Sequence, residues 1–264
     1  MDSSKTIGFV PTMGALHQGH LDLMRRSREE NDLTVVSVFV NPLQFGPRED
    51  FSRYPRNLAG DASLAESVGV DIVFAPTADT MTRESTTQVV VGGVTELWEG
   101  ERRPGHFAGV ATIVAKLFNI VRPARAYFGW KDLQQCLVIR RMVRDLNILV
   151  DLKFIETTRE PDGLAMSSRN AYLSPELRQK APALFRNLEM LREVCENRPN
   201  EFENALELAQ NALVAEGFRS DYLEWVSLET LAITRRADEP SALIAACYLG
   251  DTRLIDNIRL RNDS

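Results

Sequence analysis

The length, composition and charge of the chain exclude several classes of protein. Its 264 residues, 44% of them apolar and 26% charged, suffice for one sizeable core or for a nucleotide-binding domain with a smaller companion, and they show no bias towards disorder or fibrous repeats. The formal net charge of -6 provides no general attraction to a phosphate backbone, so a nucleic-acid partner is disfavoured.

The cysteines and the apolar runs indicate the cellular compartment of the protein. Cys136, Cys195 and Cys247 are odd in number and form no Cys-x-x-Cys pair, so we expect reduced core thiols rather than a disulfide framework or a zinc knuckle. No apolar run approaches the roughly 18 to 20 residues that span a bilayer, and the segment from Met1 to Lys5 is polar rather than a secretory signal. We therefore expect a cytoplasmic protein without a membrane partner.

Strands and helices alternate over the first half of the chain. Strands are predicted where short runs are apolar or β-branched, at residues 6–10, 33–40, 71–74, 124–128 and 152–155. Helices are predicted where the apolar period is helical, at residues 19–30, 58–68, 107–121 and 133–146. This alternation implies an α/β chain with a doubly wound, Rossmann-like parallel sheet and right-handed crossovers.

The pattern changes after Asn170. Two helices and then three strands of a separate small sheet are predicted at residues 175–196, 201–216, 222–227, 242–249 and 253–258. We therefore place a boundary near Tyr172, between a Rossmann-like domain over residues 1–171 and a small α+β domain over residues 172–264.

The segment Pro11–His20 (PTMGALHQGH) lies between the first predicted strand and the first predicted helix. In an open α/β sheet, ligands bind at this end of the strand. Gly14 and Gly19 let the backbone approach a phosphate, and the helix start supplies N–H donors. His17 and His20 share one face of the first turn, where both can donate hydrogen bonds to phosphoryl oxygens as charge develops. The segment therefore indicates phosphoryl or nucleotidyl transfer.

Two other interpretations of the histidine pair stay open. An isolated histidine on a helix is usually structural or merely exposed, but here two of the three histidines of the chain lie one turn apart between glycines, and His106 lies in another glycine-containing segment. Zinc binding by His17 and His20 is a rival, because neutral imidazoles at this spacing can ligate the metal. No third ligand at a telling spacing supports zinc.

Two further segments suit a triphosphate. In Gly129–Asp132, after a predicted strand, Lys131 can neutralise phosphates and Asp132 can cap the helix or hold a metal. Such a pair is more often a solvated cap. Met166–Arg169 concentrates two serine hydroxyls and a guanidinium, which together form an anion-binding loop. A hydrophilic linker is the alternative for this segment.

Together these segments resemble the HIGH and KMSKS signatures of the class I aminoacyl-tRNA synthetase and nucleotidyltransferase superfamily. More closely, the chain from about Ile7 to its C-terminal strands resembles the pantoate:β-alanine ligases, the pantothenate synthetase family. Five ordered blocks carry this resemblance: PTMGALHQGH, NPLQFG, RPGHFAGV, FGWKDLQQ and DGLAMSSRN. The resemblance implies a homodimeric ligase that condenses pantoate with β-alanine through a pantoyl adenylate, consuming ATP and releasing AMP and pyrophosphate.

The resemblance also implies roles for single residues. His20 would be the proton-donating catalytic histidine, and His17, Lys131 and Arg169 would stabilise charge on the phosphoryl groups. Gln44 and Gln135 would hold pantoate. Mg²⁺ would accompany ATP, and Thr158 would lie near the adenine. The implied ATP site comprises Met13, Gly14, His17, Gly19, His20, Gly129, Lys131, Asp132, Thr158, Met166, Ser167, Ser168 and Arg169.

The chain departs from the family pattern in several places. Trp130 stands where the family often has glutamate, and residues 79–82 replace an aromatic-proline segment near the site entrance. Gly60 and Leu64 leave Asp61 as a poor candidate for the magnesium contact. Family members usually have a longer segment before the first strand, so an N-terminal helix is expected to be missing or the start altered.

Other functions remain as alternatives. A different adenylyl or cytidylyl transferase of the superfamily would join a nucleotide to a phosphorylated acceptor, but such an acceptor would call for extra Arg or Lys where Gln44 and Gln135 stand. A tRNA synthetase is disfavoured because no anticodon-binding region or basic surface is evident. A nucleotide-sensing module would bind ATP without turnover.

Overall fold

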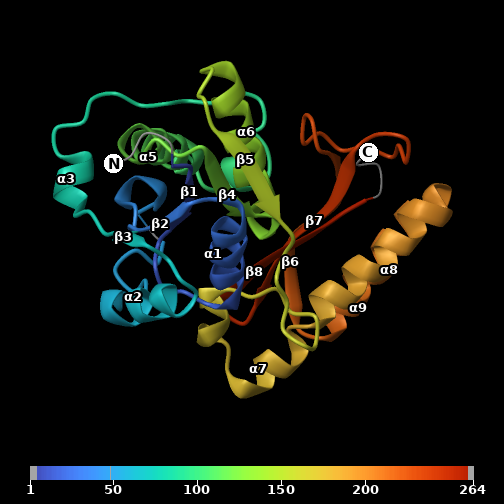
Figure 1. Cartoon of the computed structure of the whole chain (residues 1–264). Helices are drawn as coiled ribbons and strands as arrows, with labels where there is room; N and C mark the ends of the chain where they lie inside the picture. The colour runs from blue at the N-terminus through green and yellow to red at the C-terminus, as the bar shows by residue number, and fades with distance from the viewer. Residues whose placement is uncertain (1–4, 48, 261–264) are drawn as a thin grey trace. The chain divides into compact units, whose positions relative to one another are not determined.

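The computed structural model describes residues 5–47 and 49–260, and the chain divides into two compact units (Figure 1). The first unit comprises residues 1–130 and 134–156, and the second comprises residues 131–133 and 157–264. The expectation about the start of the chain concerns Met1–Lys5, of which Met1–Ser4 lie outside the described residues.

Within the described residues, the first unit contains a five-stranded parallel sheet. Its strands are β1 (Ile7–Thr12), β2 (Leu33–Val38), β3 (Ile72–Phe74), β4 (Arg125–Gly129) and β5 (Asp151–Ile155). They lie in the order β3-β2-β1-β4-β5. The chain winds outward from β1 in one direction through β2 and then in the other through β4, so the topological switch point lies between β1 and β4. The doubly wound fold predicted from the sequence is confirmed.

Helices cover both faces of this sheet. Figure 1 shows α1 and α2 on one face and α5 and α6 on the other. These four are α1 (Gln18–Glu30), α2 (Leu58–Ser67), α5 (His106–Val121) and α6 (Leu133–Asp145). Shorter elements in the connections are η1 (Pro42–Gln44), α3 (Ala78–Thr82), α4 (Glu99–Arg102) and η2 (Trp130–Asp132). Because both faces are covered, the central strands are nearly continuous apolar runs with buried side chains.

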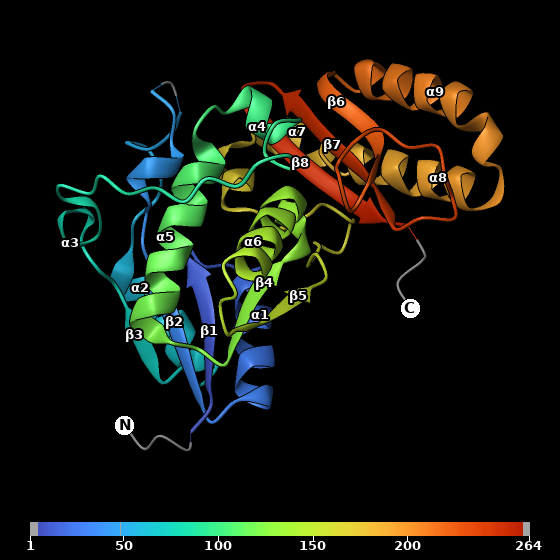
Figure 2. The same ribbon diagram turned by 90° about the horizontal axis from the view of Figure 1, so that it is seen from above.

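The second unit is an antiparallel sheet covered by helices (Figure 2). Its strands are β6 (Phe218–Ser227), β7 (Ser241–Leu249) and β8 (Thr252–Arg259), in the order β6-β7-β8. The helical elements are η3 (Ser168–Tyr172), α7 (Pro175–Lys180), α8 (Ala183–Asn197), η4 (Pro199–Glu201) and α9 (Phe202–Ala215). Leu188 and Leu191 of α8, Ala209 of α9 and Trp225 of β6 are fully buried in a common core. The predicted small α+β unit is therefore present.

Two boundaries differ from the sequence-based expectations. Residues 175–196 form two helices rather than one, because Pro182 has no N–H to continue α7 and instead takes the N-cap position of α8. The units separate between Glu156 and Thr157, so the predicted boundary near Tyr172 lies inside the second unit. Residues from 157 onward belong there because Arg159 pairs with Asp256 of β8.

Side chains confirm the expectation for the cysteines. All three are buried thiols rather than disulfides. None of the helices in the described part of the chain combines the length and the apolar character needed to cross a membrane.

Candidate active site

The loop between β1 and α1 lies beside the switch point of the sheet. β1 ends at Thr12 and α1 begins at Gln18. Between them, Gly14 (φ 81°) and Ala15 (φ 50°) adopt left-handed backbone conformations. Glycine adopts this conformation freely, whereas alanine does so only at a cost that the surrounding structure must offset. The loop is therefore a specific turn rather than a loose connection.

The loop delivers two histidines to the first turn of α1. The ring centroids of His17 and His20 lie 4.1 Å apart, with the planes inclined at 41°. The backbone N–H of His17 donates to Nδ1 of His20 at 3.3 Å. Since Nδ1 is an acceptor in this bond, the proton of neutral His20 resides on Nε2. His20 thus offers Nε2–H as a hydrogen-bond donor, as a phosphoryl-stabilising role requires.

Backbone N–H groups of the same loop are directed at protein acceptors. Gly14 donates to Oγ1 of Thr12 at 3.2 Å. Ala15 and Leu16 donate to the two carboxylate oxygens of Asp61 at 3.1 and 2.8 Å. A Cβ on Gly14 would lie 2.7 Å from Oδ2 of Asp61. The glycine is thus required by the close approach of this carboxylate, while its contact with ATP stays a prediction.

Gln44 lies in η1, and its side chain is held at both ends. Nδ2 of Asn41 donates to Oε1 of Gln44 at 3.0 Å, and Nε2 of Gln44 lies 3.0 Å from Sδ of Met13. Asn41 also donates to the carbonyl of Gly109 in α5 at 3.1 Å. The structure therefore places the residue predicted to bind pantoate in contact with a residue predicted to line the ATP site.

His106 and Arg103 hold the backbone of Gln44, a function that the sequence did not reveal. Nδ1 of His106 donates to the carbonyl of Gln44 at 2.9 Å, and Nη2 of Arg103 donates to the same oxygen at 3.3 Å. Nη1 of Arg103 lies 3.1 Å from Nε2 of His106 and donates to it, and Glu49 pairs with the same guanidinium at 2.6 Å. Burial, together with the Arg103 charge, lowers the pKa of His106 to about 4. The imidazole is therefore neutral at pH 7.

Gly129 ends β4, the other strand at the switch point, and Gln135 follows it in α6. A Cβ built on Gly129 meets no atom within 4 Å, so open space lies beside this backbone. Gln135 is half-buried in the first turn of α6. Its neighbour Gln134 is buried and donates to the carbonyls of Val94 and Leu97 at 2.8 and 2.9 Å, which is a structural role.

Trp130, at the position where the chain departs from the family pattern, is a core residue. Its side chain is buried, and its ring centroid lies 4.8 Å from that of Phe154 on β5. The tryptophan therefore extends the apolar core of the first unit.

The remaining residues predicted to bind ATP belong to the second unit. Nζ of Lys131 lies 3.3 Å from Oδ1 of Asp132, and the carbonyl of Lys131 accepts a hydrogen bond from Nδ2 of Asn257 in β8 at 3.0 Å. Met166 donates its N–H to the carbonyl of Thr158 at 3.0 Å. In the next turn, Oγ of Ser167 accepts the N–H of Arg169 at 3.3 Å and caps η3, which also contains Ser168.

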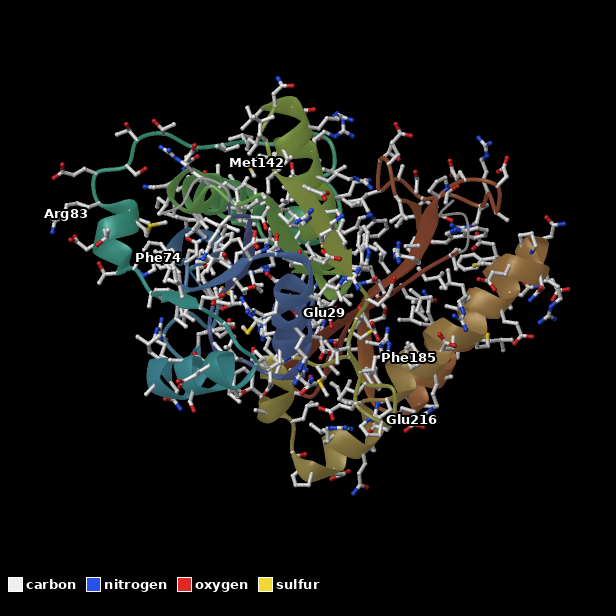
Figure 3. All side chains as sticks on the ribbon, in the orientation of Figure 1. Glu29, Phe74, Arg83, Met142, Phe185 and Glu216 are labelled. Carbon is white, nitrogen blue, oxygen red and sulfur yellow. The ribbon has the colours of Figure 1, made fainter. Side chains whose placement is uncertain are left out.

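An ion pair on β8 holds the segment that precedes this turn. Arg159 forms two hydrogen bonds with Asp256, at 2.7 and 3.0 Å, and donates to the carbonyl of Gly163 at 3.1 Å. Its guanidinium lies 3.7 Å from the ring centroid of Phe185, which Figure 3 labels on α8. The segment that leads to the predicted KMSKS-like loop is thus anchored to both the sheet and a helix of its own unit.

Asp61, the candidate magnesium contact, is engaged by backbone donors of the protein itself. Mg²⁺ requires oxygen ligands in octahedral geometry, usually one or two carboxylates beside the phosphates of the substrate. Each oxygen of Asp61 instead accepts a backbone N–H. Over residues 5–47 and 49–260, no three His, Cys, Asp or Glu side chains are grouped so that they could hold a metal ion. The zinc interpretation of His17 and His20 therefore has no third ligand in this part of the chain.

Known proteins resemble this chain in sequence and in fold. The family described as pantoate-beta-alanine ligase matches residues 1–259. The chain is 53% identical to the pantothenate synthetase of a Thermus thermophilus strain, over 96% of this chain and 93% of the relative. It is 48% identical to that of Caldicellulosiruptor bescii, over 96% and 91% of the two chains.

Solved structures agree with these relatives. A crystal structure of the pantothenate synthetase from Thermus thermophilus has a TM-score of 0.90 and 52% identity, covering 96% of this chain and 92% of that one. The pantoate-beta-alanine ligase of Francisella tularensis, complexed with beta-gamma ATP and beta-alanine, has a TM-score of 0.83 and 33% identity, covering 98% and 91%. The chain therefore belongs to the pantoate-beta-alanine ligase family.

Proposed function

We propose that this chain is an ATP-dependent ligase that condenses pantoate with β-alanine to pantothenate and releases AMP and pyrophosphate. Membership of the family over nearly the whole chain supports this, as does the relative crystallised with an ATP compound and β-alanine. The observation in the chain that carries the proposal is the His17–His20 pair at the start of α1, where His20 offers an Nε2–H donor just after the loop that follows β1.

In the proposed first step, a carboxylate oxygen of pantoate attacks the α-phosphorus of ATP. The new P–O bond gives pantoyl adenylate, and the bond to pyrophosphate breaks. Nε2–H of His20 stabilises the charge that develops on the phosphoryl oxygens, and His17 assists. Lys131, Ser167, Ser168 and Arg169 contribute further donors for the triphosphate. Gln44 and Gln135 orient pantoate through their amides.

In the proposed second step, the amine of β-alanine attacks the acyl carbon of the adenylate. The C–N bond forms, the bond from the acyl carbon to the AMP oxygen breaks, and the amine releases a proton to water. Mg²⁺ accompanying ATP would neutralise part of the charge on the phosphate oxygens. In this proposal Thr158 lies near the adenine, Met166 contacts ATP, and Gly129 contacts it at a backbone that has open space beside it.

One experiment distinguishes this function from its alternatives. Purified protein is mixed with Mg-ATP and pantoate, and pyrophosphate is measured before and after β-alanine is added. We expect about one pyrophosphate per active site from pantoate alone, and continuous AMP release only when β-alanine is also present. ATP binding without pyrophosphate release would identify a nucleotide-sensing module. Turnover with a phosphorylated alcohol or a mononucleotide, but not with pantoate, would identify another nucleotidyltransferase.

Two further properties belong to this proposal. We infer a homodimer from the resemblance to the family, and a cytoplasmic location because the reaction consumes ATP. Light scattering after size-exclusion chromatography tests the first, since the chain has a mass of 29.7 kDa and a dimer has twice that mass. Fractionation of source cells tests the second.

A further inference from the structure

Asp61 is a buried carboxylate in the first unit whose position is fixed by its own helix. It is the fourth residue of α2, and its backbone N–H donates to the carbonyl of Asn57 at 2.9 Å. The Asn57 side chain caps the same helix by accepting the N–H of Gly60 at 3.1 Å. Asp61 is 4% exposed. The helix therefore presents the carboxylate at a defined point.

The carboxylate meets two successive N–H groups of the β1–α1 loop. Ala15 donates to Oδ2 and Leu16 donates to Oδ1, at 3.1 and 2.8 Å. Successive N–H groups that converge in this way form an anion-binding concavity, and here the anion is supplied by the protein. The residues involved are 45 and 46 positions apart in sequence, so the contact joins α2 to the loop.

The backbone conformation of the loop depends on this contact. Ala15 has a φ of 50°, which an L-residue with a side chain adopts only when its surroundings require it. Thr12 fixes the opposite side of the turn, since its Oγ1 accepts from Gly14 and donates to the carbonyl of Ser37 at 2.7 Å. His17, the N-cap of α1, follows Leu16 directly. Movement of the Ala15–Leu16 peptide would therefore be transmitted to both imidazoles.

We propose that Asp61 is a positioning residue for the adenylate-forming step: by binding the N–H groups of Ala15 and Leu16 it fixes the loop that presents His17 and His20, and it does not act as a magnesium ligand. The catalytic part of this inference rests on the proposed function. The structural part, that the carboxylate sets the loop and the imidazoles, stands independently and is tested independently.

The first test is Asp61→Asn. The carboxamide retains one acceptor oxygen, but its NH₂ group faces a backbone N–H, so one hydrogen bond is replaced by two opposed donors. We expect pantoate-dependent pyrophosphate release to slow roughly tenfold to a hundredfold, the scale of an ångström-sized misplacement of catalytic groups. The Mg²⁺ concentration for half-maximal rate should stay at its wild-type value. A magnesium ligand would instead raise that concentration severalfold, and such a rise would overturn the proposal.

A second substitution tests the backbone directly. Glycine adopts positive φ without the cost that alanine incurs, so Ala15→Gly added to Asp61→Asn should restore part of the lost rate. A lost metal ligand cannot be restored in this way. No recovery in the double variant, with a wild-type rate for Ala15→Gly alone, would contradict the proposal.

NMR provides a readout that does not depend on activity. The chain has three histidines, so the imidazole signals are few enough to assign. In Asp61→Asn we expect the amide signals of Ala15 and Leu16 and the ring signals of His17 and His20 to shift, while those of His106 stay in place. Unchanged loop and ring signals would overturn the structural part of the proposal, even for an enzyme whose substrate is not pantoate.

Asp71→Asn is the matched control. Asp71 also accepts a backbone N–H, that of Thr34 at 2.7 Å, and pairs with Arg28 at the start of β3. The control therefore removes a comparable hydrogen bond in the same sheet, at the amino-terminal ends of its strands, opposite the β1–α1 loop. We expect wild-type turnover and unshifted His17 and His20 signals from Asp71→Asn.

If Asp61→Asn does not fold, hydrogen exchange in the wild-type protein decides: fast exchange of the Ala15 and Leu16 amides would refute the contact.

Discussion

At the scale of single residues, the two ring nitrogens of His20 have different functions: Nδ1 holds the backbone, and Nε2 is the proposed catalytic donor. Nδ1 accepts the N–H of His17, which satisfies one of the donors left unpaired at the start of α1. Nε2 therefore carries the proton and is the nitrogen that, in the proposed mechanism, donates to a phosphoryl oxygen. A test of the histidine must separate these two functions.

We expect His20→Ala to slow adenylate formation roughly a hundredfold or more, the scale of one lost transition-state donor. His20→Asn provides the comparison, because its Oδ1 can still accept the N–H of His17 while no group replaces Nε2–H. Rapid-quench measurement of ATP cleavage in a single turnover gives both rates. Similar losses in the two variants would assign the effect to Nε2–H. Cleavage near the wild-type rate in His20→Asn would remove that donor from the mechanism.

Gln44 shows why a neutral amide suits an anionic substrate. The pantoate carboxylate is the nucleophile in the proposed first step, so a salt bridge to it would stabilise the ground state and slow its attack. We expect Gln44→Arg to retain or tighten pantoate binding while kcat falls. Steady-state kinetics with varied pantoate measure the split between KM and kcat.

Gln44→Met is the control for this prediction. Methionine has a similar length but no charge, and like arginine it cannot accept the hydrogen bond from Asn41 that the structure shows. We expect it to weaken pantoate binding rather than to retain it. An unchanged kcat in Gln44→Arg would show that the charge of the nucleophile does not explain the choice of an amide.

At the scale of elements, α5 and η1 are joined through one imidazole. His106 begins α5, and its Nδ1–H holds the carbonyl of Gln44, 62 residues away in sequence. Gly109, one turn later, lets the η1 backbone approach, since a Cβ there would lie 2.2 Å from the carbonyl oxygen of Leu43. The position of the Gln44 amide, which we propose binds pantoate, thus depends on the first two turns of a helix that lies after a long connection.

The pairing of His106 predicts a pH dependence of stability. Its pKa falls from 6.5 to about 4 in the folded protein, because burial and the charge of Arg103 disfavour a second ring proton. The unfolded chain therefore binds a proton at a higher pH than the folded chain does. The stability contributed by neutral His106 is fully present above pH 6.5 and is lost as the pH falls towards 4, amounting to roughly 3 kcal/mol at the lower limit.

His106→Asn tests this dependence, because its Nδ2 can replace Nδ1 as a donor to Gln44 but does not titrate. We expect the free energy of unfolding, measured in urea from pH 7 to pH 4, to fall more steeply in the wild type than in the variant. Parallel curves would show that His106 does not couple folding to protons.

At the scale of the whole molecule, the sequence predicted both units and most of their elements. Short apolar runs bounded by Pro, Gly or Asn located the strands, because a buried parallel strand needs side chains that pack on both faces. The helices α3 and α4 were missed since segments of five and four residues carry no readable period. The break at Pro182 was missed because the apolar pattern runs across it.

In the candidate site, too, some features could be predicted from the sequence and others could not. Local spacing revealed the His17–His20 pair, since residues one turn apart share a helix face. The hydrogen bonds that hold the backbone of the site join residues far apart in sequence. Asp61 meets Leu16 across 45 positions and His106 meets Gln44 across 62, and neither pairing leaves a periodic signal in the chain. The one-turn spacing of Arg103 and His106 was the available hint.

Arg159 and Asp256 allow the stability of one unit to be tested separately. Asp256 is 5% exposed, and two hydrogen bonds from Arg159 balance its charge, so the pair joins the segment after β5 to β8 within the second unit. We expect Arg159→Ala to destabilise that unit by about 3 to 5 kcal/mol, because it leaves a buried carboxylate without its partner. Hydrogen exchange should then accelerate for core amides of β6, β7 and β8. Exchange in β1, β2 and β4 should keep its wild-type rate, since those strands have a core of their own.

Removing both charges in Arg159→Met/Asp256→Leu should recover part of the lost stability. Equal acceleration in both sheets would show that the two units unfold as one.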